Sequence, residues 1–222
     1  MQGARLPLLG ALLLLAGTCF AQPMPDAMER LRPVASGSPA GAALLLAMRH
    51  GGLVLFMRHA DTSGMACDRS FRVGDRAGQR NISEQGRLQA RAVAAALREA
   101  GVRLQMPVLA GPVFRARDTA EAAFGPHNVV VTDSLLADDY ADGRLDWVLA
   151  EHRRLFGTPP REQGMNVMLV GHRTPAIMVL GPSLGGRALP EGALVLLRPR
   201  GDGGAAVLGV LELAPVAWRD VC

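Results

Sequence analysis

Two runs of apolar residues in this chain each end abruptly in polar side chains that include a histidine. Residues 53–57 are all apolar and are followed directly by Arg58 and His59. Residues 166–170, which are apolar after Asn166, end in the same way, with His172 two positions later. Short apolar runs of this kind predict buried strands of a parallel sheet. Because ligands bind outside the carboxyl ends of such strands, both histidines stand where an α/β fold carries its chemistry.

Strand and helix patterns alternate through the rest of the chain. The expected helices cover residues 39–50, 84–100, a segment around 115–119, 144–156 and 176–180. The remaining expected strands cover residues 107–110, 128–131, 193–197 and 205–213. This alternation predicts an α/β fold, a three-layer αβα sandwich with a mostly parallel central sheet. The last two strands flank a glycine-rich turn at 202–204, which predicts a C-terminal antiparallel edge hairpin.

A second Arg-His pair, Arg49 and His50, precedes the first buried strand. Both residues fall in the last turn of an expected helix that stops at Gly51. Cations are favourable there because they complement the negative end of the helix dipole. We therefore interpret this pair as a feature of the helix end and not as part of a site.

The N-terminal 21 residues have the pattern of a signal peptide. A single basic residue, Arg5, precedes an apolar run over residues 6–20, and Ala21 supplies a small residue for cleavage. A lipoprotein modified at Cys19 and an uncleaved membrane anchor are the alternatives. Residues 22–38 contain three prolines and predict a linker, so we assign residues 39–222 to the folded domain. The expected location is periplasmic or secreted, and no membrane span is expected in the mature chain.

Removal of the signal peptide would leave two cysteines, Cys67 and Cys222. An even number of cysteines in an oxidising compartment indicates a disulfide. We expect this bond to tie the C-terminus to the loop after the first buried strand. Two unrelated thiols are the alternative.

Composition excludes several classes of function. The chain contains 24 arginines and no lysine. The lack of lysine excludes Schiff-base chemistry and the lysine-bearing phosphate loop. The net charge is only +4 and aromatic residues make up 4% of the chain, so no basic, aromatic-rich stripe for nucleic acid is present. The five histidines show no metal-ligand spacing. We expect no cofactor and no nucleic-acid partner.

A third strand-to-helix junction carries Arg115. In a parallel sheet such junctions gather along one edge, so Arg58, His59, Arg115 and His172 can converge. Guanidinium groups match phosphate oxygens bidentately and stay charged at any working pH. An imidazole can attack phosphorus and hold it as phosphohistidine. This set of side chains therefore suits a phosphoryl group.

Four segments together resemble the histidine phosphatase superfamily, the phosphoglycerate-mutase-like fold. Arg58-His59-Ala60 stands in the place of the family's Arg-His-Gly after the first strand, with alanine replacing glycine. Residues 81–87 resemble the family's Ser/Thr-x-x-Gly segment, which opens the next helix. Residues 111–120 resemble its Ser-Pro-x-x-Arg-x-x-x-Thr-Ala segment, with Gly111 replacing serine, and residues 170–172 match its second histidine motif. The resemblance covers the chain from about Leu53 onward.

The resemblance implies a role for each matching residue. His59 would be the nucleophile, and Arg58 and Arg115 would clamp the oxygens of the transferring phosphoryl group. His172 would stabilise the same group as a hydrogen-bond donor, and the Thr62 hydroxyl could add a contact. No metal is needed in such a mechanism.

The leaving oxygen needs a proton, which the family takes from a carboxylate in the loop after the third motif. Asp138 is our first choice for this carboxylate and Asp139 our second. The spacing of the motifs does not distinguish between the two residues. A proton donor must stay protonated until it is used, so its pKa should be raised by its surroundings. A merely solvated acidic loop is the alternative.

Other functions fit the sequence less well. Residues 181–185 read Gly-x-Ser-x-Gly, the pattern of a serine hydrolase, but such a fold needs its histidine after the serine and none follows His172. The sequence therefore predicts a metal-independent phosphomonoesterase that works through phosphorylated His59 on a small phosphorylated substrate. A catalytically weak phosphate-binding module and a phosphoglycerate-mutase-type phosphotransferase remain the alternatives.

Overall fold

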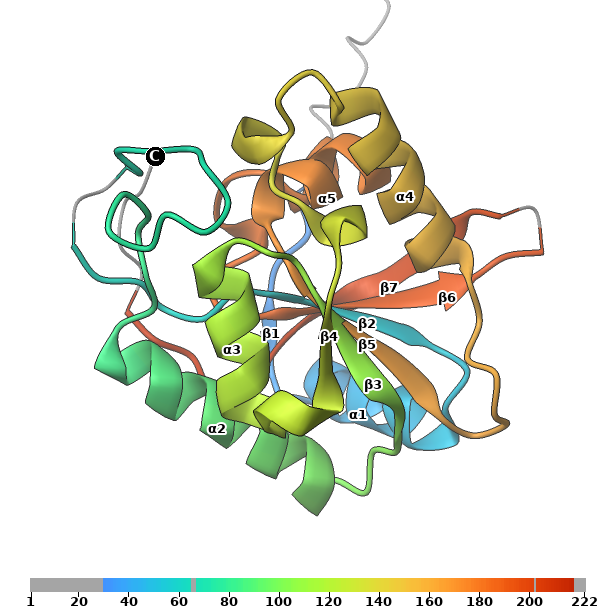
Figure 1. Ribbon diagram of the computed structural model, residues 1–222. Coiled ribbons are helices and arrows are strands. Elements are labelled where there is room, and N and C mark those ends of the chain that lie inside the picture. The colour runs from blue at the N-terminus through green and yellow to red at the C-terminus, as the bar shows by residue number, and fades with distance from the viewer. Residues whose placement is uncertain (1–29, 65–66, 202, 218–222) are drawn as a thin grey trace, which may run out of the picture.

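The computed structural model describes residues 30–64, 67–201 and 203–217 of the 222-residue chain, and shows one sheet between two layers of helices (Figure 1). The helices are α1 (Pro39–His50), α2 (Glu84–Glu99), α3 (Phe114–Phe124), α4 (Leu145–Gly157) and α5 (Arg173–Leu180). The strands are β1 (Val34–Ala35), β2 (Val54–Arg58), β3 (Leu104–Ala110), β4 (Val129–Val131), β5 (Asn166–Gly171), β6 (Leu194–Pro199) and β7 (Ala205–Glu212). The predicted three-layer αβα sandwich is confirmed.

The strands lie in the order β1-β7-β6-β2-β5-β3-β4. Strand β6 pairs antiparallel with both β2 and β7, whereas every other pairing in this sheet is parallel. Only β6 among the described strands therefore runs against the rest, which confirms a mostly parallel sheet with an antiparallel hairpin toward one side. The carboxyl ends of β2, β5 and β3 consequently lie side by side at one edge of the sheet.

The segment that we expected to be a linker contributes to this sheet. Val34 and Ala35 form β1, which pairs in parallel with β7 and lies outside the hairpin. A two-residue strand next to Pro33 is too short to show the alternation that indicates a strand in a sequence. Residues 1–29, which include the expected signal peptide, lie outside the described residues.

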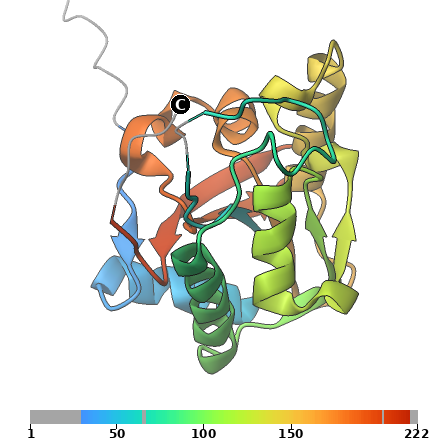
Figure 2. The ribbon, with the colours of Figure 1, turned by 60° about the vertical axis from the view of Figure 1, so that its left-hand side comes forward.

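The two faces of β2 pack against different helices. Leu55 and Met57 point into a core that α1, α2 and α3 complete, whereas Val54 and Phe56 point into a core completed by α4 and α5. Figures 1 and 2 show these two helical layers on opposite faces of the sheet. All five residues of β2 are buried, which explains why the sequence shows a continuous apolar run there.

Helix boundaries follow their capping residues. Ser38 caps α1 by accepting a hydrogen bond from the amide of Gly41, and Ser83 caps α2 through the amide of Gly86. Arg49 and His50 lie exposed in the last turn of α1, as predicted.

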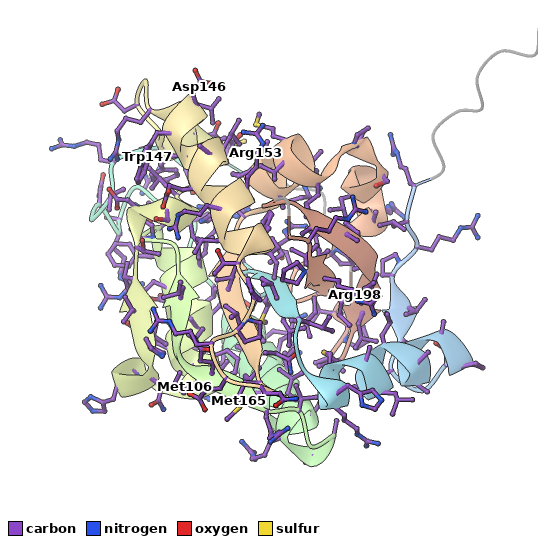
Figure 3. All side chains as sticks on the ribbon, turned by 90° about the vertical axis from the view of Figure 1, so that its right-hand side faces the viewer. Met106, Asp146, Trp147, Arg153, Met165 and Arg198 are labelled. Carbon is purple, nitrogen blue, oxygen red and sulfur yellow. The ribbon has the colours of Figure 1, made fainter. Side chains whose placement is uncertain are left out.

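The outer side of α4 carries charged side chains and one exposed tryptophan. Asp146, Trp147 and Arg153 lie on its exposed side, as Figure 3 shows. Within the described ranges, no helix combines the length and the apolar character that crossing a membrane requires.

Asn166 joins three elements at the end of the sheet opposite the histidines. Its side-chain amide donates to the carbonyls of Met48 (2.8 Å) and Arg103 (3.0 Å), and its oxygen accepts from the amide of Leu53 (3.3 Å). The side chain is fully buried. It therefore satisfies backbone groups that water cannot reach.

Substitution Asn166→Ala should destabilise the fold by roughly 2–4 kcal/mol, because it leaves buried backbone donors and acceptors without partners. Chemical denaturation monitored by circular dichroism measures this change. The exposed Asn128, whose side chain also bonds a carbonyl, is the matched control, and Asn128→Ala should change the free energy of unfolding by less than about 0.5 kcal/mol. Equal losses in both variants would contradict the role of Asn166.

Candidate active site

The pairing of β2 with β5 brings the two predicted histidines together. Arg58 pairs with Gly171, so the residues that follow, His59 and His172, leave the sheet side by side. The amide of His59 donates to the carbonyl of Gly171 at 3.0 Å, and the two imidazole rings lie 5.5 Å apart between centroids. Both side chains are almost fully buried.

The surroundings of His59 hold its ring neutral. Burial is the main cause, and the cations Arg58 and Arg115 add to it, so the pKa of His59 lies well below its usual range. Its Nδ1 lies 3.0 Å from the carbonyl oxygen of Ala60, an acceptor only, so Nδ1 carries the proton. The lone pair is therefore on Nε2, as a nucleophile for phosphorus requires.

Arg58, Arg115 and His172 each have a buried nitrogen that finds no hydrogen-bond acceptor among the residues that the structure describes. These atoms are Nε of Arg58, Nε of Arg115 and Nε2 of His172. The other groups of Arg58 are held by the carbonyl of Leu189 at 2.9 Å and the carboxylate of Glu191 at 3.3 Å. Buried donors in folded proteins are normally satisfied, so unsatisfied ones that cluster indicate a ligand.

Burial lowers the pKa of Arg58 to about 9, and Glu191 opposes this shift. Arg58 therefore remains a cation at neutral pH. Burial also lowers the pKa of the His172 imidazole well below its usual range, with the charge of Arg115 adding to the effect. A neutral His172 can donate one hydrogen bond to an anion without adding a charge.

The structure adds Arg80 and Asp68, which lie outside the four sequence motifs. The Arg80 side chain is 9% exposed and lies 3.7 Å from Glu191. Asp68 accepts from the Arg115 guanidinium at 2.8 Å, the Tyr140 hydroxyl at 2.7 Å and the Arg80 amide at 2.5 Å. Burial opposes ionisation of Asp68, but these hydrogen bonds prevail and lower its pKa. Asp68 is thus an ionised anchor for Arg115.

Thr62 lies at the site but is engaged by Glu191. Its hydroxyl donates to the Glu191 carboxylate at 3.1 Å, and its amide donates to the other carboxylate oxygen at 3.3 Å. The hydroxyl proton is therefore committed to a carboxylate in this structure. A direct contact of Thr62 with phosphate stays a prediction.

Asp138 and Asp139 lie in a single 3-10 turn, η3 (Asp138–Tyr140), but in different surroundings. Asp138 is half-buried and Asp139 is exposed. Burial, and then the charge of Asp139, raise the pKa of Asp138. A raised pKa is what a proton donor needs, so the structure favours Asp138 of the two.

Other residues of the sequence motifs position the loop after β2. The Thr119 hydroxyl accepts from the amide of Ala60 at 2.9 Å and donates to the carbonyl of Arg115 at 2.7 Å, which links the two arms of the site. A Cβ added at Gly86 would lie 2.1 Å from the carbonyl oxygen of Asp61. Only glycine therefore allows the start of α2 to approach this loop so closely.

Residues 63–64 and 67–80 reach the site through Asp68, which contacts Arg115, and through Arg80, which contacts Glu191. This loop lies beside the start of α3 (Figures 1 and 2), where Arg76 forms an ion pair with Asp118 at 2.6 Å. Cys67 in the loop is disulfide-bonded. Cys222 lies outside the described residues, so the predicted pairing of these two cysteines stays a prediction.

The order of these elements and the buried side chains agree with one known family. Residues 54–140 match the family model of the histidine phosphatase superfamily (branch 1). The match contains His59, Arg115 and Asp138 and ends before His172. Residues 54–140 are therefore similar to the histidine phosphatase superfamily. No curated protein matches the chain significantly.

Solved structures of phosphatases are among those similar to this chain. One is the protein histidine phosphatase SixA complexed with tungstate, which is 19% identical, with 72% of this chain and 97% of that chain covered and a TM-score of 0.49. Another is a mycobacterial glucosyl-3-phosphoglycerate phosphatase complexed with VO3, 19% identical, with 71% and 97% covered and a TM-score of 0.49. Similarity at this level does not add to the fold assignment, which stands on the strand order and register.

Metal ligands do not cluster in the part of the chain that the structure describes: no group of three or more histidine, cysteine, aspartate or glutamate side chains is placed to hold an ion.

His152 is buried, and its Nδ1 lies 2.8 Å from the carbonyl of Val148 in its own helix. Burial lowers the pKa of His152 as it does for His59 and His172.

The free energy of unfolding should fall as the pH falls below about 6.5, because these three histidines gain protons only in the unfolded chain. Above that pH the histidines do not reduce the free energy of unfolding. Below it, each histidine lowers the free energy of unfolding by up to about 1.4 kcal/mol per pH unit. Urea titrations at a series of pH values from about 8 to about 5 measure this slope. His152→Gln should make it shallower, whereas His127→Gln, at an exposed position, should not. A stability independent of pH would contradict neutral buried histidines.

Proposed function

We propose that this protein is a metal-independent phosphomonoesterase that works through phosphorylated His59. One observation carries the proposal: the buried, unsatisfied nitrogens of Arg58, Arg115 and His172 surround a histidine that is held neutral. The tetrahedral phosphoryl group supplies several acceptor oxygens with a negative charge, which suits donors that converge in this way. The family match supports phosphatase chemistry.

In the first step, Nε2 of His59 attacks phosphorus while the bond to the leaving oxygen breaks. The phosphoryl group moves to His59, and its oxygens are held by Arg58, Arg115 and His172. Because charge builds up on these oxygens in the transition state, donors that are already in place lower the barrier. In the second step, water attacks the phosphohistidine, and His59 and inorganic phosphate are released.

Asp138 is the proposed source of the proton for the leaving oxygen. Its raised pKa favours the protonated form that the first step needs. The resulting carboxylate can then accept a proton from the attacking water, which returns Asp138 to its starting state.

We also propose that the protein acts outside the cytoplasm, on an exported or envelope substrate. The signal-like N-terminal sequence supports this location, and the disulfide bond at Cys67 fits an oxidising compartment. A protein exported in this way would meet phosphomonoesters to hydrolyse and not the cytosolic sugar-acid phosphates of a mutase.

His59→Ala should abolish hydrolysis of p-nitrophenyl phosphate, with a loss of at least about 10³-fold in kcat. The reason is that this variant lacks the proposed nucleophile that accepts the phosphoryl group. Release of p-nitrophenol by the purified chain without residues 1–21 measures this. His127→Ala is the control, since His127 is exposed and lies outside the sequence motifs. Full activity in His59→Ala would refute the mechanism, whereas phosphate binding without turnover in the parent would indicate a binding module.

Asp138→Asn should slow hydrolysis of an alkyl phosphate by about 10²-fold or more but affect p-nitrophenyl phosphate much less. An alkoxide leaves only with a proton, whereas p-nitrophenolate leaves without one. Glycerol phosphate and p-nitrophenyl phosphate, compared in the same variant, measure the difference. Asp139→Asn is the matched control and should leave both rates close to the parent. The reverse result would make Asp139 the donor.

A further inference from the structure

Glu191, in the turn before β6, lies outside the sequence motifs but contacts several residues of the site. Its carboxylate lies 3.3 Å from the Arg58 guanidinium and 3.7 Å from that of Arg80. It also accepts from the amide and the hydroxyl of Thr62 at 3.3 and 3.1 Å. The Glu191 side chain is only 11% exposed. A carboxylate at the centre of a predicted anion site needs an explanation.

The contact with His59 shows on which side of the ring Glu191 lies. The nearest ring nitrogen is Nδ1, at 3.8 Å from the carboxylate. This is the nitrogen that donates to the carbonyl of Ala60, whereas the proposed nucleophile is Nε2. Glu191 therefore approaches the ring from the side opposite the phosphoryl group. It supports the site without filling the phosphate position.

The backbone fixes Glu191 in this place. Its carbonyl accepts from the side-chain amide of Gln89 at 2.9 Å, and the amide of Gly192 donates to the carbonyl of His59 at 3.0 Å. The same Gln89 side chain accepts from the amide of Asp61 at 2.9 Å. The turn that carries Glu191 and the loop that carries His59 are thus held as one unit.

The charge of Glu191 matters most when His59 is phosphorylated. Attack by Nε2, while Nδ1 keeps its proton, leaves the imidazole ring with a formal positive charge. A carboxylate close to Nδ1 stabilises that charge, and the low local dielectric of a buried site strengthens the effect. The same carboxylate opposes the effect of burial on the pKa of Arg58, which is about 9, so Arg58 is a cation at neutral pH.

We propose that Glu191 is a positioning residue that holds Arg58 and Thr62 in place and stabilises the cationic ring of phosphorylated His59. This role rests on the proposed function of the site. This role predicts two different effects of a substitution at Glu191. Loss of the negative charge should slow phosphoryl transfer, yet it should leave binding of inorganic phosphate unchanged or make it tighter, because an anion binds better where a neighbouring negative charge has been removed.

The experiment compares the parent chain with Glu191→Gln and Glu191→Ala. Rapid mixing with p-nitrophenyl phosphate and quenching in alkali, where phosphohistidine survives, gives the rate of phosphoenzyme formation by mass spectrometry. We expect a fall of at least about 10-fold in Glu191→Gln and a larger fall in Glu191→Ala. Calorimetry with inorganic phosphate should give a Kd no weaker than that of the parent for Glu191→Gln.

Other outcomes would overturn the proposal in distinguishable ways. A parallel loss of transfer rate and phosphate affinity would show a general structural role, and a gain in both would show that the carboxylate blocks the phosphate position. Rates equal to the parent would show no role. Glu121→Gln removes a carboxylate from a surface ion pair with Arg117 and should match the parent throughout. If His59→Ala retains activity, the proposed function itself fails, whatever Glu191 does.

Discussion

Three guanidinium groups are buried around two neutral histidines, and the rest of the site depends on how their charge is balanced. Removing a cation from water costs several kcal/mol unless hydrogen bonds and opposite charges compensate for it. Asp68 compensates Arg115, and Glu191 compensates Arg58. These carboxylates come from the loop of residues 63–80 and from the turn before β6, far apart in sequence. The arginines can therefore be buried as cations only once the folded chain has brought these carboxylates next to them.

The same balance explains why the loop of residues 63–80 is part of the site and not a mere connection. Asp68 ties this loop to Arg115 and to the Tyr140 hydroxyl, next to Asp138 in η3. The side chain that fixes a phosphate clamp thus also fixes the element that carries the proposed proton donor. The proposed phosphate clamp and the element of the proposed proton donor are thus joined by one buried carboxylate, whose ionised state the surrounding hydrogen bonds favour.

Much of the fold could be predicted because its signals are local. The run that became β2 is buried on both faces, so its apolar character is continuous, and Ser83 and Gly51 mark helix ends by their own conformational preferences. Strand β1 could not be predicted, because two residues carry no periodicity and pair only once β7 is in place. Asn166 carried no recognisable signal either, since its three partners come from separate parts of the chain.

The sequence by itself determined which groups meet at the edge of the sheet. Residues that come directly after parallel strands gather at one edge of the sheet. The convergence of Arg58, His59, Arg115 and His172 could therefore be expected from their positions after three strand patterns. Only the tertiary structure decided their chemical states and their partners. Burial makes both histidines neutral, exposure separates Asp139 from Asp138, and the contacts of Arg80, Asp68 and Glu191 arise from the packing of distant loops. Burial and long-range electrostatics depend on what surrounds a group in space, which no local pattern of residues records.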